Sequence, residues 1–188
     1  MVIKPYDECN GGIITASGEE NVQHYGGAGI GGGYMGSGSN ITINGGSVTA
    51  NGKGGGAGIG GGYMGSGSNI IIYDGIITAI SEENDIDYCG AGIGGGCQSN
   101  GSDITIYDGK VTATGGFFAA GIGGGGGCPG SYITINGGEL MVTGGTFAAG
   151  IGGGYQGSGS YITINGGVVK ARGGDNGGDA LGKRFGYT

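Results

Sequence analysis

The chain has 188 residues, of which 58 are glycine and 2 are proline, and its formal net charge is −7. Only 7 residues are lysine or arginine, which excludes the clustered basic surface that a nucleic-acid backbone requires. No apolar run reaches the roughly 18 residues of a membrane span, and the residues after Met1 lack the pattern of a signal peptide. These features fit a cytosolic chain or a piece of a longer secreted protein, and we expect the latter.

Three short phrases recur along the chain in a fixed order. The isoleucine of the AGIGGG phrase stands at Ile30, Ile59, Ile93, Ile122 and Ile151, with a degenerate copy at Leu181. An ITI phrase begins 11 residues later each time, at Ile41, Ile70, Ile104, Ile133 and Ile162. A VTA-like phrase is centred on Ile14, Val48, Ile77, Val111, Leu140 and Val169. The AGIGGG steps of 29, 34, 29, 29 and 30 residues therefore define six repeats.

These phrases predict short strands. ITI and VTA alternate apolar and polar residues, and the glycine density between phrases excludes helices. One repeat cannot bury a core alone, so the repeats must stack with like residues above one another. The predicted fold is all-β: a right-handed parallel β-helix (β-solenoid) of about six 29-residue turns, forming a single domain over residues 1–188. The turns are expected at residues 1–30, 31–59, 60–93, 94–122, 123–151 and 152–188.

Two turns carry matching five-residue insertions. The interval from the VTA-position residue to the next AGIGGG isoleucine is 16 residues in turns 1 and 3, but 11 in turns 2, 4 and 5. Both insertions contain Glu-Glu-Asn followed by a tyrosine. Because oxygen-rich loops favour hard cations, they suggest a calcium site. Its ligands would be Glu19, Glu20, Glu82, Glu83 and Asp85. The alternatives are solvated acidic loops and a duplicated two-turn unit.

Tyrosines recur at fixed positions beside amides or carboxylates. Tyr73-Asp74 and Tyr107-Asp108 follow the ITI phrase, where the other turns have asparagine. Tyrosine next to Asn or Asp is typical of a sugar-binding surface, because the ring contacts C–H groups and the polar group binds hydroxyls. The predicted ligand-binding residues are Tyr25, Tyr88, Tyr73, Tyr107, Asp74 and Asp108. The alternative is that stacked tyrosines shield the corners.

The cysteines predict neither a metal site nor a definite disulfide. Cys9 aligns with an inward position and is expected to be buried. Cys89 and Cys97 are expected about 25 Å apart on an extended strand, which is too far for a disulfide. Cys97 and Cys128 lie in neighbouring turns, where a disulfide is feasible but not predicted.

Catalysis finds little support. His24 is the only histidine, and no Gly-x-Ser-x-Gly motif accompanies it. Lys53 lies between the two acidic loops, which keeps a lyase as an alternative. Glu19 and Glu82 would form the carboxylate pair of a glycosidase if they lay about 5–10 Å apart. We predict no catalytic residues.

The phrases ITINGGSVTANG, ITIYDGKVTATGG and ITINGGVVKARGG, alternating with GAGIGGG, resemble repeats of large bacterial cell-surface proteins. They are also similar to the calcium-binding, carbohydrate-binding right-handed β-helix modules of bacterial plant-polysaccharide degraders. The resemblance extends from about Asn10 to Arg172. It implies secretion, surface display and polysaccharide binding.

These observations together predict a non-catalytic carbohydrate-binding or adhesive module, extracellular or on the cell surface, with neighbouring domains in a longer chain. Its partner would be a glycan or cell-wall polysaccharide. The alternatives are a structural stalk or spacer, and a polysaccharide lyase or glycosidase of the β-helix class.

Overall fold

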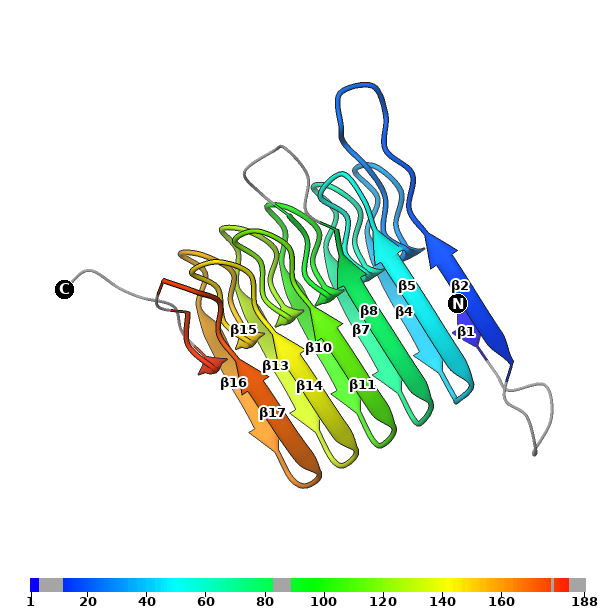
Figure 1. The fold of residues 1–188 in the computed structure, drawn as a ribbon, viewed down its shortest axis with the longest axis vertical. Helices are drawn as coiled ribbons and strands as arrows, with labels where there is room; N and C mark the ends of the chain where they lie inside the picture. The colour runs from blue at the N-terminus through cyan, green and yellow to red at the C-terminus, as the bar shows by residue number, and fades with distance from the viewer. Residues whose placement is uncertain (4–11, 83–88, 177, 183–188) are drawn as a thin grey trace.

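The computed structural model describes residues 1–3, 12–82, 89–176 and 178–182, which form strands and turns (Figure 1). Their strands make three parallel sheets of six strands each. Among these residues, no helix is long and apolar enough to cross a membrane.

Each turn of the chain contributes one strand to each sheet. Sheet A contains β1 (Val2–Ile3), β4 (Gly38–Ile43), β7 (Gly67–Ile72), β10 (Gly101–Ile106), β13 (Gly130–Ile135) and β16 (Gly159–Ile164). Sheet B contains β2 (Ile13–Ser17), β5 (Ser47–Gly52), β8 (Ile76–Ser81), β11 (Lys110–Thr114), β14 (Glu139–Thr143) and β17 (Val168–Arg172). Sheet C contains β3 (Ile30–Gly31), β6 (Ile59–Gly60), β9 (Ile93–Gly94), β12 (Ile122–Gly123), β15 (Ile151–Gly152) and β18 (Leu181–Gly182).

The strand register confirms the predicted stack. Ile41 pairs with Ile70, and Ile70 pairs with Ile104. In sheet B, Val48 pairs with Ile77 in the same way. Equivalent residues therefore lie one turn apart, at a spacing of about 4.8 Å. The parallel β-helix is confirmed, and its right-handed sense stays a prediction.

The core lies between the three sheets. The inward isoleucines of sheet A, the VTA-position residues of sheet B and the single isoleucine of each sheet C strand form one apolar cluster. In the central turns these side chains are completely buried, as Ile104, Val111 and Ile122 illustrate. The stacking of like side chains therefore gives each turn the core that one repeat cannot make alone.

Sheet C explains the glycine-rich phrase. Gly94 has a φ of +134°, and a Cβ at this position would collide with the carbonyl oxygen of Gly123 in the next turn. The turns on this side approach backbone to backbone, so side chains are excluded there.

The chain between β2 and β3 contains the first insertion and rises above the loops of the regular turns (Figure 1). An antiparallel bridge joins Glu20 to Gly26 at its base. Oδ1 of Asn21 accepts hydrogen bonds from the amides of Gln23 (2.9 Å) and Tyr25 (3.1 Å), which holds the tip in a tight turn.

Candidate functional site

The outer face of sheet A is shaped by a left-handed kink at the same position of every full strand. Each of these strands begins Gly-Ser-X, and X has a left-handed φ between 50° and 54°. X is Asn40, Asn69, Asp103, Tyr132 and Tyr161 in successive turns. Because of this kink, the serine and X both lie on the outer side before the alternation resumes with a buried isoleucine. On the outer face, each turn thus exposes X, the middle residue of the ITI phrase and the residue that follows the strand.

Four exposed tyrosines form two stacks on this face. The ring centroids of Tyr73 and Tyr107 are 4.9 Å apart with planes 7° from parallel, and those of Tyr132 and Tyr161 are 4.7 Å apart with planes at 5°. Both distances match the spacing between turns, so the rings follow one another along the stack axis. Tyr73 and Tyr107 are each 46% exposed, Tyr132 54% and Tyr161 69%.

Stacking covers one face of each ring, and the outer faces of Tyr107 and Tyr132 look toward shorter side chains. Asn136 occupies the turn beyond Tyr107, because the Asn136 amide donates to the strand residue that precedes Tyr107. On the other side, Asp103 occupies the turn before Tyr132. The outer part of each ring extends past its shorter neighbour. Of the four outer faces of the two stacks, those of Tyr107, which follows β10, and of Tyr132, in β13, lie on neighbouring turns and look in opposite directions along the axis. We call these two the open ring faces.

Amide ladders flank the tyrosine stacks. Nδ2 of Asn69 donates to Oδ1 of Asn40 at 2.7 Å, and Nδ2 of Asn165 donates to Oδ1 of Asn136 at 2.8 Å. Each bond joins neighbouring turns, so the amides fix one another beside the ends of the stacks.

Asp74 and Asp108 lie next to the first stack, as the sequence predicts. Oδ1 of each carboxylate accepts a hydrogen bond from the amide of the glycine that follows it, at 2.6 Å for Asp74 and 2.8 Å for Asp108. Asp74 also lines, with Ile76 and Lys110, an open hollow of about 620 Å³. Four of the six predicted ligand-binding residues therefore lie together at one end of the sheet A strands.

Tyr25 lies elsewhere. Its half-buried ring packs against Tyr63, at a centroid distance of 4.3 Å, and against Tyr34 at 5.8 Å, beside sheet C. The predicted set is therefore divided between two places. Tyr88 lies outside the described residues.

Two carboxylates of the predicted calcium site lie beside basic side chains. Oε1 of Glu20 lies 3.2 Å from Nδ1 of His24, and Oε2 of Glu82 lies 3.9 Å from Nζ of Lys53. Glu19 is exposed, and Glu83 and Asp85 lie outside the described residues. Within the part of the chain that the structure describes, no three His, Cys, Asp or Glu side chains gather as a metal ion would need.

A comparison with protein families matches all six turns. The family model described as Beta helix repeat matches residues 10–34, 41–63, 70–97, 104–126, 133–155 and 162–180. The chain belongs to the beta helix repeat family. No curated protein and no solved structure matches this beta helix.

The sequence analysis missed two tyrosines of this beta helix, Tyr132 and Tyr161. Both follow a serine, in the position where earlier turns have GSN or GSD. The signal was available, because aligning the ITI phrases places both residues in the X column. Alternation back from the inward isoleucine also places X on the outer face, so both tyrosines were overlooked only because earlier turns have Asn or Asp in this column.

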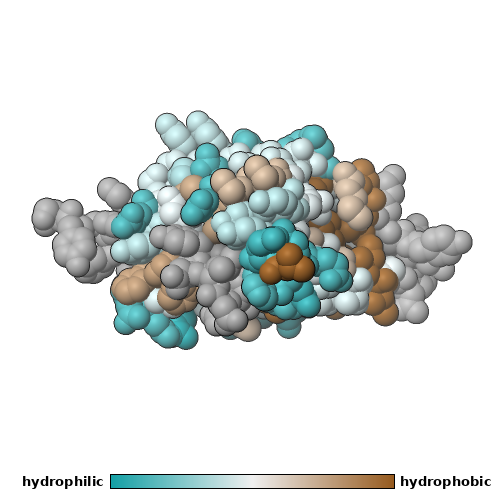
Figure 2. Space-filling view, turned by 90° about the horizontal axis from the view of Figure 1, so that it is seen from above, coloured by the Kyte–Doolittle hydropathy of each residue, from teal (hydrophilic) through white to brown (hydrophobic). Residues whose placement is uncertain are grey.

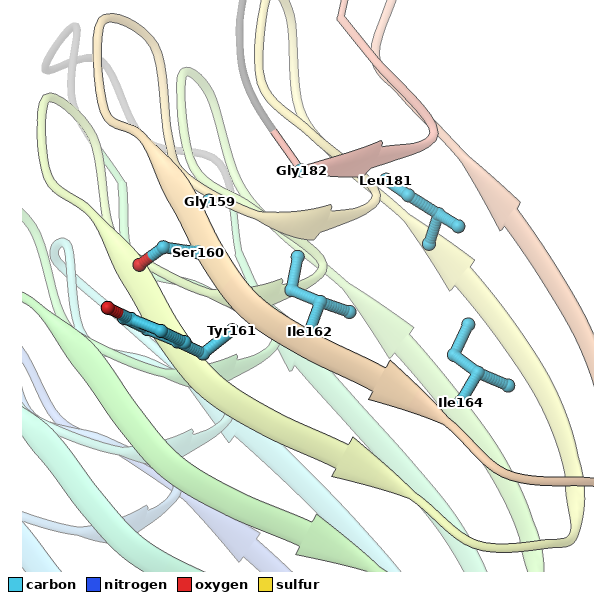
Figure 3. A pocket seen from close by; sticks show the side chains of 7 residues that line it. All are labelled: Gly159, Ser160, Tyr161, Ile162, Ile164, Leu181 and Gly182. Carbon is cyan, nitrogen blue, oxygen red and sulfur yellow. The ribbon is translucent and has the colours of Figure 1, made fainter.

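Both ends of the beta helix expose apolar residues. Figure 2 shows hydrophobic residues gathered at the end that carries β1 and β2, where Val2 is 58% and Ile13 83% exposed. At the other end, Ile162, Ile164 and Leu181 border an open hollow of about 400 Å³, with Tyr161 beside it (Figure 3). This hollow is the open end of the core and not an enclosed ligand cavity.

Proposed function

We propose that this beta helix is a non-catalytic carbohydrate-binding or adhesive module, and that it binds a glycan or cell-wall polysaccharide on the outer face of sheet A. The observation that supports the proposal is the pair of exposed tyrosine stacks, whose open ring faces adjoin amide and carboxylate groups. Ring faces suit the C–H groups of a sugar, and the polar groups suit its hydroxyls. The module would act outside the cell, joined to neighbouring domains.

The position of the open faces suggests a ligand larger than one sugar. Tyr132 occupies the X column, whereas Tyr107 occupies the column four residues further along the strand. The two faces are therefore separated by roughly 13 Å along the strands. We expect oligosaccharides to bind more tightly than the monosaccharides that compose them.

Binding to a glycan array, followed by titration of the hits, tests the proposal. Tyr107→Ala and Tyr132→Ala should each lower the affinity about tenfold, since an aromatic contact contributes about 1.5 kcal/mol. Tyr34→Ala is the matched control, because Tyr34 is 49% exposed but lies outside the outer face of sheet A. Equal losses in all three variants, or no glycan bound by the unaltered protein, would contradict the proposal.

A structural stalk or spacer is the second candidate. The tyrosine stacks and amide ladders join successive turns, which is what a stiff spacer requires. In that case Tyr107→Ala would reduce stability by about 1 kcal/mol, and the protein would bind no glycan.

A lyase or glycosidase needs a separate test, because Lys53 and Glu82 are neighbours beside the acidic loops. We expect no unsaturated products when the protein is incubated with pectin. Product formation that Lys53→Ala abolishes would overturn the non-catalytic proposal.

Calcium would need Glu83 and Asp85 in addition to the described carboxylates. If the insertions bind calcium, millimolar calcium raises the melting temperature, and the double variant Glu83→Gln/Asp85→Asn abolishes the shift. A melting temperature that calcium does not change would remove calcium from the proposal.

A further inference from the structure

Two columns of side chains run along the loop side of sheet C, and each contains one cysteine. The first column lies four residues before each sheet C isoleucine and contains Gly26, Gly55, Cys89, Phe118 and Phe147. The second lies four residues after it and contains Tyr34, Tyr63, Cys97, Gly126 and Tyr155. We call these columns together the loop-side edge.

The two columns interdigitate. In each turn, the second-column amide donates to the first-column carbonyl of the turn before it, as Cys97 does to Gly55 at 2.7 Å and Tyr155 to Phe118 at 2.7 Å. The ring of Tyr155 contacts Phe118 of the previous turn, at a centroid distance of 4.7 Å, and Phe147 of its own turn at 5.4 Å. A second-column side chain therefore lies between two first-column side chains.

This arrangement makes Cys89 and Cys97 neighbours, because they are the two members of one turn. The equivalent pair in the turn before is Gly55 and Tyr63. A Cβ built on Gly55 would lie 2.7 Å from Cδ2 of Tyr63 in its own turn and 3.0 Å from Cβ of Cys97 in the next turn. A second-column side chain therefore touches the first-column positions of its own turn and of the turn before, which places Cys97 against Cys89. The expectation of about 25 Å between the two cysteines is wrong, because the intervening strand β9 has only two residues and the chain bends at Gly94.

The third cysteine, Cys128, is the accessible member. It follows Gly126, the neighbour of Cys97 in the next turn, and its amide donates to the carbonyl of Gly125 in a tight turn. Cys128 is half-buried, whereas Cys89 and Cys97 are completely buried. Each of these two buried thiols interacts electrostatically with the other, and Cys97 also with Cys128.

We propose that the loop-side edge is a thiol-oxidation site, in which a low-molecular-weight disulfide such as oxidised glutathione reacts at Cys128 and the oxidation ends as a Cys89–Cys97 disulfide. This inference is independent of the proposed glycan site.

The exchange proceeds in three steps. The Cys128 thiolate attacks oxidised glutathione, which forms a mixed disulfide and releases one glutathione. The Cys97 thiolate then attacks the sulfur of Cys128 and releases the second glutathione. Finally the Cys89 thiolate attacks Cys97, and Cys128 leaves as a thiol. In total Cys89 and Cys97 lose two hydrogens, and one oxidised glutathione becomes two reduced glutathiones.

The reaction should accelerate with pH. Burial, together with the neighbouring Cys89 and Cys128 thiols, raises the pKa of Cys97 to about 12, and burial raises the pKa of Cys128 above its usual value. Tyr63, which also interacts with Cys97, has its pKa raised mainly by burial and adds no charge near neutral pH. Because the thiolate is the attacking species, the exchange is faster at pH 9 than at pH 7.

Mass spectrometry of tryptic peptides identifies the product. Cleavage after the lysines places Cys89 and Cys97 together in residues 54–110, and Cys128 alone in residues 111–170. All proteins carry Cys9→Ala, which removes the cysteine that lies outside the described residues. After folded protein is treated with oxidised glutathione and then alkylated, peptide 54–110 should be lighter by two hydrogens and unalkylated. Peptide 111–170 should carry one alkyl group.

Three results would overturn the proposal: peptide 54–110 alkylated twice, a final cross-link between the two peptides, or a lasting glutathione adduct on Cys128. Two variants test the order of the steps. Cys128→Ala should reach the same product several-fold more slowly, and an unchanged rate would remove Cys128 from the pathway. Cys97→Ala should stop at the Cys128 adduct with Cys89 still a thiol. Circular dichroism melts confirm that each variant is folded before it is oxidised.

Discussion

The interior of the beta helix and its loop-side edge follow the same repeat, but they differ in what the repeat may contain. Inside sheet A, one position holds Ile41, Ile70 and Ile104 in successive turns. At the loop-side edge, one column changes from Gly55 to Cys89 to Phe118 over the same number of turns. The difference shows where side-chain volume is fixed and where it is free to vary.

In the first four turns the two columns of the edge compensate for each other, whereas Phe147 and Tyr155 of the fifth turn are both large. Gly55 accompanies Tyr63, Phe118 accompanies Gly126, and two residues of intermediate size, Cys89 and Cys97, accompany each other. An interior side chain is enclosed by three sheets and has no such partner to adjust. The interior of sheet A therefore repeats isoleucine, whereas the edge accepts pairs that range from Gly55 with Tyr63 to Phe147 with Tyr155.

The largest expected effect concerns the interior. Ile104→Ala removes a completely buried side chain and should lower the free energy of unfolding by about 4 kcal/mol. Ile164→Ala changes the same type of position at the open end, where the side chain is 40% exposed, and should cost about 1 kcal/mol. Urea denaturation measures both, and equal losses would contradict the distinction between the enclosed core and its end.

The next effect separates glycines that touch a neighbouring turn from those that do not. A Cβ on Gly62 would collide with the carbonyl oxygen of Gly33, whereas a Cβ on Gly33 meets nothing within 4 Å. Both glycines stand in the same phrase, GAGIGGGYMGSGSN. Gly62→Ala should therefore cost about 3 kcal/mol, and Gly33→Ala should be nearly neutral. Thermal melts of the two variants give the comparison, which would fail if both melted alike.

A smaller effect is expected at the loop-side edge. Phe118 is only half-buried, although its ring contacts Phe117 at 4.2 Å and Tyr155 at 4.7 Å between centroids. Phe118→Ala should cost about 2 kcal/mol, which is below the usual loss for a fully enclosed phenylalanine. Urea denaturation again supplies the measurement. A loss as large as that of Ile104→Ala would show that the edge is packed as tightly as the interior.

The sequence predicted the fold well because the residues that determine it are repeated. The spacing of Ile30, Ile59 and Ile93 sets the turn, and the ITI phrase sets the register that the strands adopt. Each of these signals occurs several times, so a single irregular turn does not obscure it.

The candidate site was predicted only in part. Contacts between residues at different positions of the repeat produce no periodic pattern in the sequence. Tyr73 and Tyr107 were found because they share one column. The contact of Tyr25 with Tyr63 crosses from one column to another, and so does the approach of Cys89 to Cys97. Such contacts depend on how sharply the two-residue strands of sheet C bend, which spacing along the chain does not reveal.

The backbone contact between equivalent glycines of successive turns has a consequence for how such a chain can change in length. Because Gly33 and Gly62 stand in identical phrases, removing residues 31–59 would join Ile30 to Gly60, the residue equivalent to Gly31. Each backbone contact between successive turns would then be made by an equivalent residue. Recombination between the repeated segments of the gene can thus lengthen or shorten the protein by whole coils. Insertions of other sizes fit in the loops before sheet C, as the five-residue insertions of turns 1 and 3 show, but within the glycine-rich phrase they would put side chains where only hydrogen fits.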